Sequence, residues 1–82
     1  MTTTELTEED LTDGQIDIIS LLVKSGLAPT RSEGRRNVEQ GGVTVDGEKV
    51  TDFKAVFTKD ALTGDGIVLK RGKKKFQKVV IK

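Results

Sequence analysis

The stretch that decides the fold spans residues 30–49 and reads TRSEGRRNVEQGGVTVDGEK. Its first half predicts a short helix, because Thr30 and Glu33 have the spacing of a capping box and a Gly-Gly pair can end the helix in a left-handed conformation. Its second half predicts a tight hairpin, since Val43 and Val45 alternate with Thr44, Asp46-Gly47 suits a type I′ turn, and Lys49 and Val50 return.

The predicted helix carries three arginines, Arg31, Arg35 and Arg36, within six positions. A guanidinium group suits phosphate because its planar fork gives bidentate hydrogen bonds, and free amides at a helix N-terminus also favour anions. Glu33 is engaged by the cap, and Glu39 can pair with only one arginine. We therefore expect the arginines to be incompletely neutralised, although a solvated amphipathic helix is the alternative reading of the same residues.

Two segments precede this helix. Residues 14–26, GQIDIISLLVKSG, carry apolar side chains at helical spacing and predict a buried first helix. Residues 1–13 are acidic and Thr-rich, and they predict a flexible linker ahead of a domain of residues 14–82. Gly34 is unusual inside the second helix. It allows either close packing on the first helix, which we favour, or close approach of a ligand backbone.

The segments after the hairpin are short and extended. Residues 53–57 predict a weak extended segment, residues 63–66 a turn, and residues 67–82 two strands broken at Gly72. The order of helix, helix and several strands predicts an α+β fold, with two helices packed on a small, mainly antiparallel sheet.

The terminal strands are strongly basic. Five of the six residues 70–75 are Lys or Arg, and no acid follows Asp65. Protection of a sheet edge explains some of these lysines, and nuclear targeting is another reading of such a run. Phe76 lies among them and could stack on a base, but the scarcity of aromatic residues favours a place in the core.

The net charge of +1 hides an asymmetry. Residues 1–23 hold six acids and no base, whereas residues 24–82 hold fourteen bases against seven acids, a net charge of +7. This asymmetry favours a polyanionic partner, although a solvated surface with ordinary lysines has the same count. The chain has no Cys and no His, which removes thiolate sites, the commonest metal ligand and the usual partner of a nucleophilic serine. We expect a domain that binds, does not catalyse and holds no cofactor or metal.

The expected location is the cytoplasm, since no apolar run approaches the ~20 residues of a membrane span and the acidic N-terminus lacks a signal-peptide pattern. We expect no membrane partner. A module whose lysine run binds an anionic membrane or an acidic protein is nevertheless an alternative from another functional class.

The segment SLLVKSGLAPTRSEGRRNVEQGGVTVDGEKV, residues 20–50, resembles the alpha-L RNA-binding motif, also called the S-four domain. The flanking segments LTEEDLTDGQIDIISLLVKSGLAPTRSE and DGIVLKRGKKKFQKVVIK are similar to the C-terminal domain of bacterial-type tyrosyl-tRNA synthetases. This resemblance covers about residues 5–82. It implies an RNA-binding domain that grips tyrosine tRNA at its long variable arm and anticodon stem.

The same resemblance implies that RNA binding and catalysis belong to separate domains. A separate catalytic domain, absent from this chain, would use ATP and Mg to join tyrosine to the tRNA; its HIGH signature needs histidine, and its KMSKS loop is also missing here. The parent protein would be an aminoacyl-tRNA synthetase and a homodimer, and this piece a monomer. A free-standing S-four-type RNA-binding protein of the ribosome or the stress response is the alternative.

The resemblance also implies which residues bind RNA. Two positions depart from the family pattern: Gly34 stands where Ala is typical, and Asp46 stands where Asn is typical at the turn. A carboxylate would repel phosphate, which argues against RNA contact by Asp46. The implied RNA-binding residues come from the second helix, the hairpin and the terminal strands: Thr30, Arg31, Ser32, Arg35, Arg36, Gln40, Lys49, Lys70, Arg71, Lys73, Lys74 and Lys75.

Overall fold

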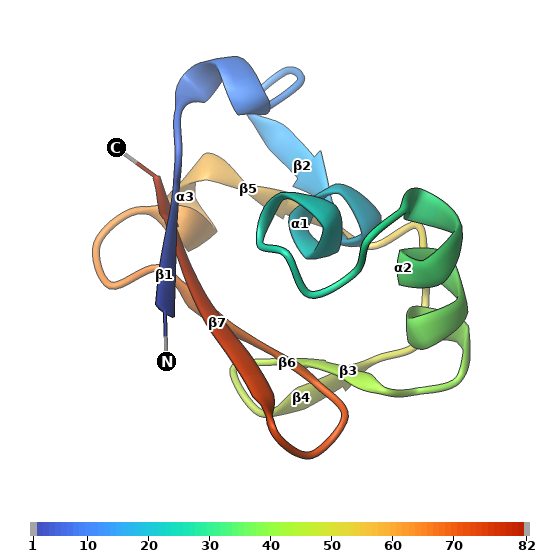
Figure 1. Ribbon diagram of the computed structural model, residues 1–82. Coiled ribbons are helices and arrows are strands. Elements are labelled where there is room, and N and C mark those ends of the chain that lie inside the picture. Colours follow the sequence, from blue (N-terminus) through green and yellow to red (C-terminus); the bar gives the residue numbers. More distant parts are fainter. Residues whose placement is uncertain (1, 82) are drawn as a thin grey trace.

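The computed structural model describes residues 2–81, whose path is shown in Figure 1. The elements in chain order are β1 (Thr2–Leu6), the 3-10 helix η1 (Glu8–Asp10), β2 (Gln15–Asp17), α1 (Ile18–Lys24), α2 (Arg31–Glu39), β3 (Val43–Val45), β4 (Glu48–Val50), β5 (Val56–Thr58), α3 (Lys59–Leu62), β6 (Ile67–Arg71) and β7 (Lys75–Ile81).

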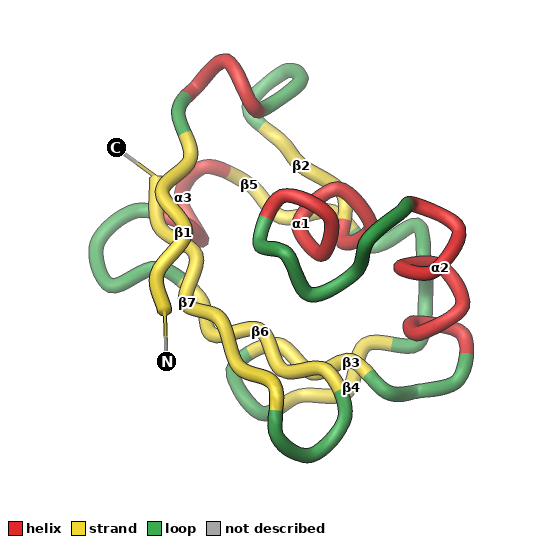
Figure 2. Tube along the Cα trace, in the orientation of Figure 1, coloured by secondary structure: helices red, strands yellow, loops and turns green. Residues whose placement is uncertain are grey.

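The strands form two sheets. Five of them pair in the order β1-β7-β6-β3-β4, and β2 pairs with β5 in a separate two-stranded sheet. Only β1 and β7 run parallel to each other; every other pair of strands among the described residues is antiparallel. In Figure 2, α1 lies between α2 and the β1-β7 side of the larger sheet. The predicted α+β fold, with two helices on a mainly antiparallel sheet, is confirmed.

The central helix α1 begins later than the sequence suggested. Residues 15–17 form β2, and the helix starts at Ile18. Asp17 caps it, because its carboxylate Oδ2 accepts a hydrogen bond from the Ser20 backbone N–H at 3.1 Å. Ile16 is buried, as expected, but it reaches the core from a strand. The spacing of apolar residues was compatible with either a helix or a strand at residues 15–17, and the capping side chain of Asp17 marks where the helix starts.

The second helix, α2, begins and ends where the sequence predicted. The Thr30 hydroxyl accepts a hydrogen bond from the Glu33 backbone N–H at 3.2 Å, and Gly41 takes a φ of +73° just beyond the C-terminus. The hairpin is also confirmed, since Asp46 and Gly47 have φ values of 51° and 86°, as a type I′ turn requires.

Gly34 lies where α2 packs on α1. A Cβ atom built on Gly34 would be 3.4 Å from Ile19 Cγ2 and 3.6 Å from Leu22 Cδ1. Of the two readings of this glycine, the structure therefore supports close packing between the helices.

Asp46 connects the β3-β4 hairpin to β6 through two hydrogen bonds. Its backbone N–H donates to the Val68 carbonyl at 2.9 Å, and its Oδ1 accepts from the Val68 N–H at 2.9 Å. The carboxylate at this turn therefore has a structural partner inside the protein.

The N-terminal segment, predicted to be a flexible linker, is part of the larger sheet over residues 2–6. Strand β1 pairs in parallel with β7, so that Leu6 stands opposite Ile81, and the Leu6 side chain is only 2% exposed. Two ion pairs hold the acidic stretch that follows: Asp10 to Lys24 at 2.9 Å, and Glu8 to Lys59. The partners of this segment lie far along the chain, which is why its local composition suggested a linker.

The core gathers around α1 and the inner faces of the strands. Its fully buried side chains include Ile18, Leu21, Leu22, Val38, Val43, Leu62, Leu69 and Val79. The short helix α3, which the sequence did not predict, contributes Leu62 to this core. None of the helices in residues 2–81 is long and apolar enough to cross a membrane.

Candidate nucleic-acid interface

The outer face of α2 presents its arginines in ion pairs. Arg35 Nε lies 2.7 Å from Glu39 Oε1, and Arg36 Nη1 lies 3.5 Å from Glu33 Oε1. Both arginine side chains remain exposed, at 57% and 66%. The expectation that Glu39 pairs with only one of them is confirmed, but Glu33, assigned to the cap alone, neutralises the other.

Arg31 is anchored on the start of α1. Its Nη1 donates to Ser20 Oγ at 2.6 Å, and its Nη2 donates to Asp17 Oδ2 at 3.2 Å. Partial burial raises the pKa of Asp17, but the hydrogen bonds from Ser20 and the Arg31 charge outweigh it and hold that pKa below its usual 3.8. With Arg31 paired as well, each arginine of α2 has a carboxylate partner, and the predicted incomplete neutralisation is wrong.

One side of α2 borders a cleft of about 570 Å³, here named the arginine cleft. Its lining residues are Arg31, Ser32, Arg35, Phe53, Lys54, Ile19 and Asp17, the carboxylate that pairs with Arg31. The Arg35 guanidinium lies 4.2 Å from the centre of the Phe53 ring, within cation–π distance. Sequence reasoning missed Phe53 as a site residue, because it stands outside both basic runs.

The β6-β7 turn, Arg71–Lys75, is named the lysine turn, and it meets the C-terminal end of α2. Gly72 N–H donates to the Gly42 carbonyl at 2.8 Å, and Gly42 N–H donates to the Asn37 carbonyl at 2.9 Å. Asn37 and the lysine turn line a second cleft of about 410 Å³, the lysine cleft. Figure 1 shows this turn projecting from the sheet, where β6 runs into β7.

The two clefts flank α2 on different sides. At about 100° per residue, Arg36 lies about 100° around the helix from Arg35 and Asn37 about 100° further, so Arg36 projects between them. Gly34 and Val38, which are buried, occupy the opposite side. The structure thus arranges the arginine cleft, Arg36 and the lysine cleft in succession around the exposed surface of α2, although the two basic segments are far apart in the sequence.

The lysine turn differs from α2 in its partners. Within residues 2–81, no carboxylate oxygen lies within 4.0 Å of a nitrogen of Arg71, Lys73, Lys74 or Lys75. Their charges are therefore available to an outside anion without breaking an internal ion pair.

Phe76 lies on the surface beside the lysine turn. Its side chain is 43% exposed, and the Lys70 ammonium lies 5.4 Å from the centre of its ring. The preferred expectation of a core position is therefore wrong. Alternation along β7 explains the exposure: Val79 points into the core at the odd position, and Phe76 falls on the other face.

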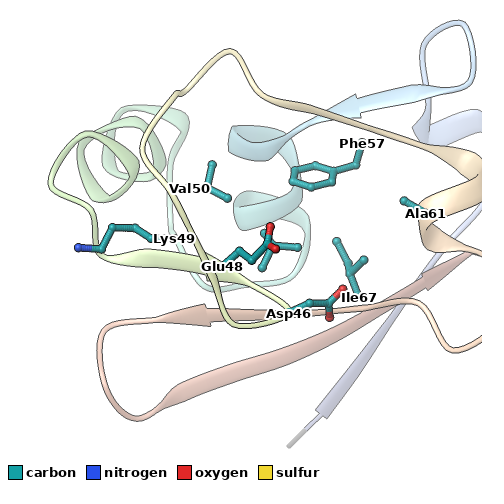
Figure 3. A pocket seen from close by; sticks show the side chains of 8 residues that line it. Asp46, Glu48, Lys49, Val50, Phe57, Ala61 and Ile67 are labelled. Carbon is teal, nitrogen blue, oxygen red and sulfur yellow. The ribbon is translucent and has the colours of Figure 1, made fainter.

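The remaining predicted residues lie around the ends of α2. Thr30 and Gln40 are the exposed caps of the helix. Lys49, on β4, runs alongside the loop after the helix, since a Cβ atom built on Gly41 would be 3.4 Å from Lys49 Cδ. Figure 3 shows the Lys49 ammonium extending away from a separate groove beside β4.

That separate groove has a different character. It measures about 340 Å³ and is lined by apolar side chains, including Phe57 and Ile67, together with the carboxylates of Asp46 and Glu48. In Figure 3 these side chains come from the β3-β4 hairpin, β5 and β6. Two carboxylates make it unsuited to phosphate, so it is not part of the candidate interface.

Comparison with known proteins gives a consistent set of matches. Residues 2–79 match a family model described as the tyrosine–tRNA ligase SYY-like C-terminal domain. A tyrosine–tRNA ligase of Clostridium botulinum (strain Loch Maree / Type A3) is 42% identical over 81 residues, covering 99% of this chain and 19% of the relative. A tyrosine–tRNA ligase of Acetivibrio thermocellus is 40% identical over 79 residues, covering 96% and 19%. The chain thus spans about a fifth of the length of these relatives.

Proposed function

Because the chain belongs to the family of tyrosine–tRNA ligase C-terminal domains, we propose that it is the tRNA-binding part of such a ligase. It holds tyrosine tRNA at the variable arm and the anticodon stem. A catalytic part outside this chain activates tyrosine with ATP and Mg and transfers it to the tRNA. The parent enzyme is a homodimer in the cytoplasm, and this chain by itself is a monomer.

The observation that carries this proposal is the lysine turn, whose cations have no carboxylate partner in the described chain and which lies against the end of α2. Helical RNA is recognised mainly through its shape and its phosphates. A surface that combines unpaired lysines with exposed arginines on one helix fits such a backbone. The Phe53 ring packs partly against the core and has the Arg35 guanidinium over its face, which holds that cation at the arginine cleft.

The test is a titration of the chain with tyrosine tRNA, both intact and with its variable arm deleted, in one buffer. We expect the intact tRNA to bind more tightly than the deleted form. Equal affinities would remove the variable arm from the proposal. A parallel titration with anionic lipid vesicles is the control, and binding to vesicles but not to tRNA would support the membrane alternative.

A further inference from the structure

Asn37 is the residue of the lysine cleft that the chain leaves unsatisfied. Its side-chain Nδ2 is buried, yet it has no hydrogen-bond partner, and no other buried side-chain nitrogen or oxygen in residues 2–81 is in this state. A buried donor without an acceptor destabilises the folded protein. Asn37 as a whole is only partly buried, so a rotation of its side chain would bring Nδ2 to the surface of the cleft, where an outside acceptor would supply the missing hydrogen bond.

The surroundings of Asn37 specify the charge of that acceptor. The other residues that line the lysine cleft are Arg71, Gly72, Lys73, Lys74 and Lys75, and the lining includes no carboxylate. Four cationic side chains and one amide donor together favour an anion that accepts several hydrogen bonds. A phosphate group has this charge and these acceptors, and successive phosphates of an RNA backbone would also pass the exposed Arg36.

We propose that Asn37 and the lysine turn form a binding site for one backbone phosphate of the bound RNA, with Asn37 Nδ2 donating to a phosphate oxygen. This inference rests on the proposed function for the source of the phosphate. It adds to the interface a neutral residue that the count of basic side chains does not reveal. Asn37 positions the phosphate, and the lysines supply the charge.

The decisive variant is Asn37→Leu, which removes the orphan donor and keeps a side chain of similar size. We expect the free chain to become more stable, with its melting temperature raised by about 4 °C. We expect its affinity for tyrosine tRNA to fall about tenfold, because a hydrogen bond to a charged oxygen is lost. The dependence of affinity on salt should not change, since Asn37 carries no charge.

The predicted rise in stability and fall in tRNA affinity have opposite signs, so they separate a role of Asn37 in binding from a role in folding. An Asn37→Leu chain that is more stable but binds tyrosine tRNA as tightly as the original would overturn the proposal. The matched control is Gln15→Leu, which removes an exposed carboxamide on β2 next to acidic residues. This control should leave tRNA affinity unchanged.

A second measurement needs no variant. Asn37 is the single asparagine of the chain, so its side-chain amide signals in a nitrogen–proton correlation spectrum can be assigned without ambiguity. We expect these signals to shift on titration with tyrosine tRNA and with inorganic phosphate, while the Gln15 amide signals stay in place. Asn37 signals that remain unmoved at saturating tRNA would refute the site, even if the Leu variant folds poorly.

The two proposals fail in different ways. If the unaltered chain does not bind tyrosine tRNA, the proposed function fails. The titration with inorganic phosphate then decides the Asn37 site alone: a shift of its amide signals supports an anion site, and no shift overturns it.

Discussion

The arginines of α2 and the lysine turn are both cationic, and they differ in what surrounds their charges. Each arginine lies within 3.5 Å of a carboxylate oxygen of the same chain. The cations of the lysine turn have no such partner in residues 2–81. Two stretches of similar composition have therefore become different kinds of surface.

The difference teaches that paired and unpaired cations can contribute to an interface in different ways. Exposed ion pairs contribute only about 0–1 kcal/mol, so an arginine of α2 can exchange its carboxylate for a phosphate at little cost. The pairs meanwhile hold the guanidinium groups in fixed positions. The lysines of the lysine turn have no carboxylate partner in residues 2–81 that would hold their ammonium groups. We infer that α2 sets the orientation of the RNA and that the lysine turn supplies most of the salt-dependent affinity.

The largest expected effect comes from disturbing the pairing of β6 with β7, the two strands that carry the lysine turn. Gly66, at the start of β6, has a φ of +73°, and a Cβ atom built on it would lie 2.1 Å from the Val79 carbonyl oxygen. Gly66→Ala should lower the free energy of unfolding by about 3 kcal/mol, because the β6-β7 backbones must move apart. Urea unfolding followed by circular dichroism measures the loss.

The matched control for this change is Gly64→Ala. Gly64 has a similar φ of +71°, but nothing lies within 4 Å of the position of its Cβ. Only backbone strain remains there, at about 1 kcal/mol. Equal losses in the two variants would show that the approach of β7 does not constrain Gly66.

The next effect concerns the lysines themselves. Replacing Lys73, Lys74 and Lys75 together by Gln should leave the unfolding free energy within about 0.5 kcal/mol of the original, because no internal ion pair is lost. The slope of log affinity for tRNA against log salt should fall by about 3, at about 0.9 for each phosphate contact with a helical nucleic acid. Filter binding at several salt concentrations measures this slope.

The salt slope of the triple lysine variant is to be compared with that of a single Arg35→Gln variant. This single substitution should reduce the salt slope by about 1 and also weaken the contact with Phe53. If the triple lysine variant changes the slope less than this single arginine variant, the division of work between the two regions is wrong.

Local signals account for the parts of the fold that the sequence predicted. Thr30 and Glu33 fixed the start of α2, and Asp46-Gly47 fixed the hairpin, because each signal acts within four residues. Strand β1 was missed because its partner β7 lies more than seventy residues away. No local pattern reports such a pairing.

The interface was predicted less completely for the same reason. The basic residues could be named from composition, but Asp17, the partner of Arg31, comes from a different element. Asn37 gave no signal, since a polar residue on a charged helix is ordinary until its burial is known. Whether the named residues contact RNA stays a prediction.

A smaller effect tests the fixed position of Arg31. Asp17 caps α1 and pairs with Arg31, so Asp17→Ala should lower the unfolding free energy by about 1 kcal/mol. Asp17→Asn keeps a capping oxygen and removes the charge, and it should lose less. Thermal unfolding of both variants at neutral pH separates the cap from the ion pair.

The pKa of Asp17 gives this prediction a pH dependence. Because the pKa is held below 3.8 in the folded chain, the ionised carboxylate stabilises the fold above pH 3.8, and this contribution disappears as the pH falls through the lowered pKa. Between pH 6 and pH 2.5, Asp17→Asn should therefore lose less stability than the original chain. Parallel losses would show that Asp17 does not carry this dependence.

The smallest effect concerns Gly34, on the buried side of α2 between the two clefts. Gly34→Ala should raise the unfolding free energy by about 0.5–1 kcal/mol, because Ala favours a helix interior and its Cβ would lie 3.4 Å from Ile19 Cγ2, an ordinary contact. Binding of tRNA should not change, since the methyl group would lie among the side chains of Ile19, Leu22 and Ala28, between α1 and α2. Thermal unfolding measures the expected gain in stability, and a tRNA titration checks that the affinity is unchanged. A loss of stability would mean that α1 and α2 pack too tightly for a methyl group, and a change in affinity at unchanged stability would mean that their spacing positions the arginines.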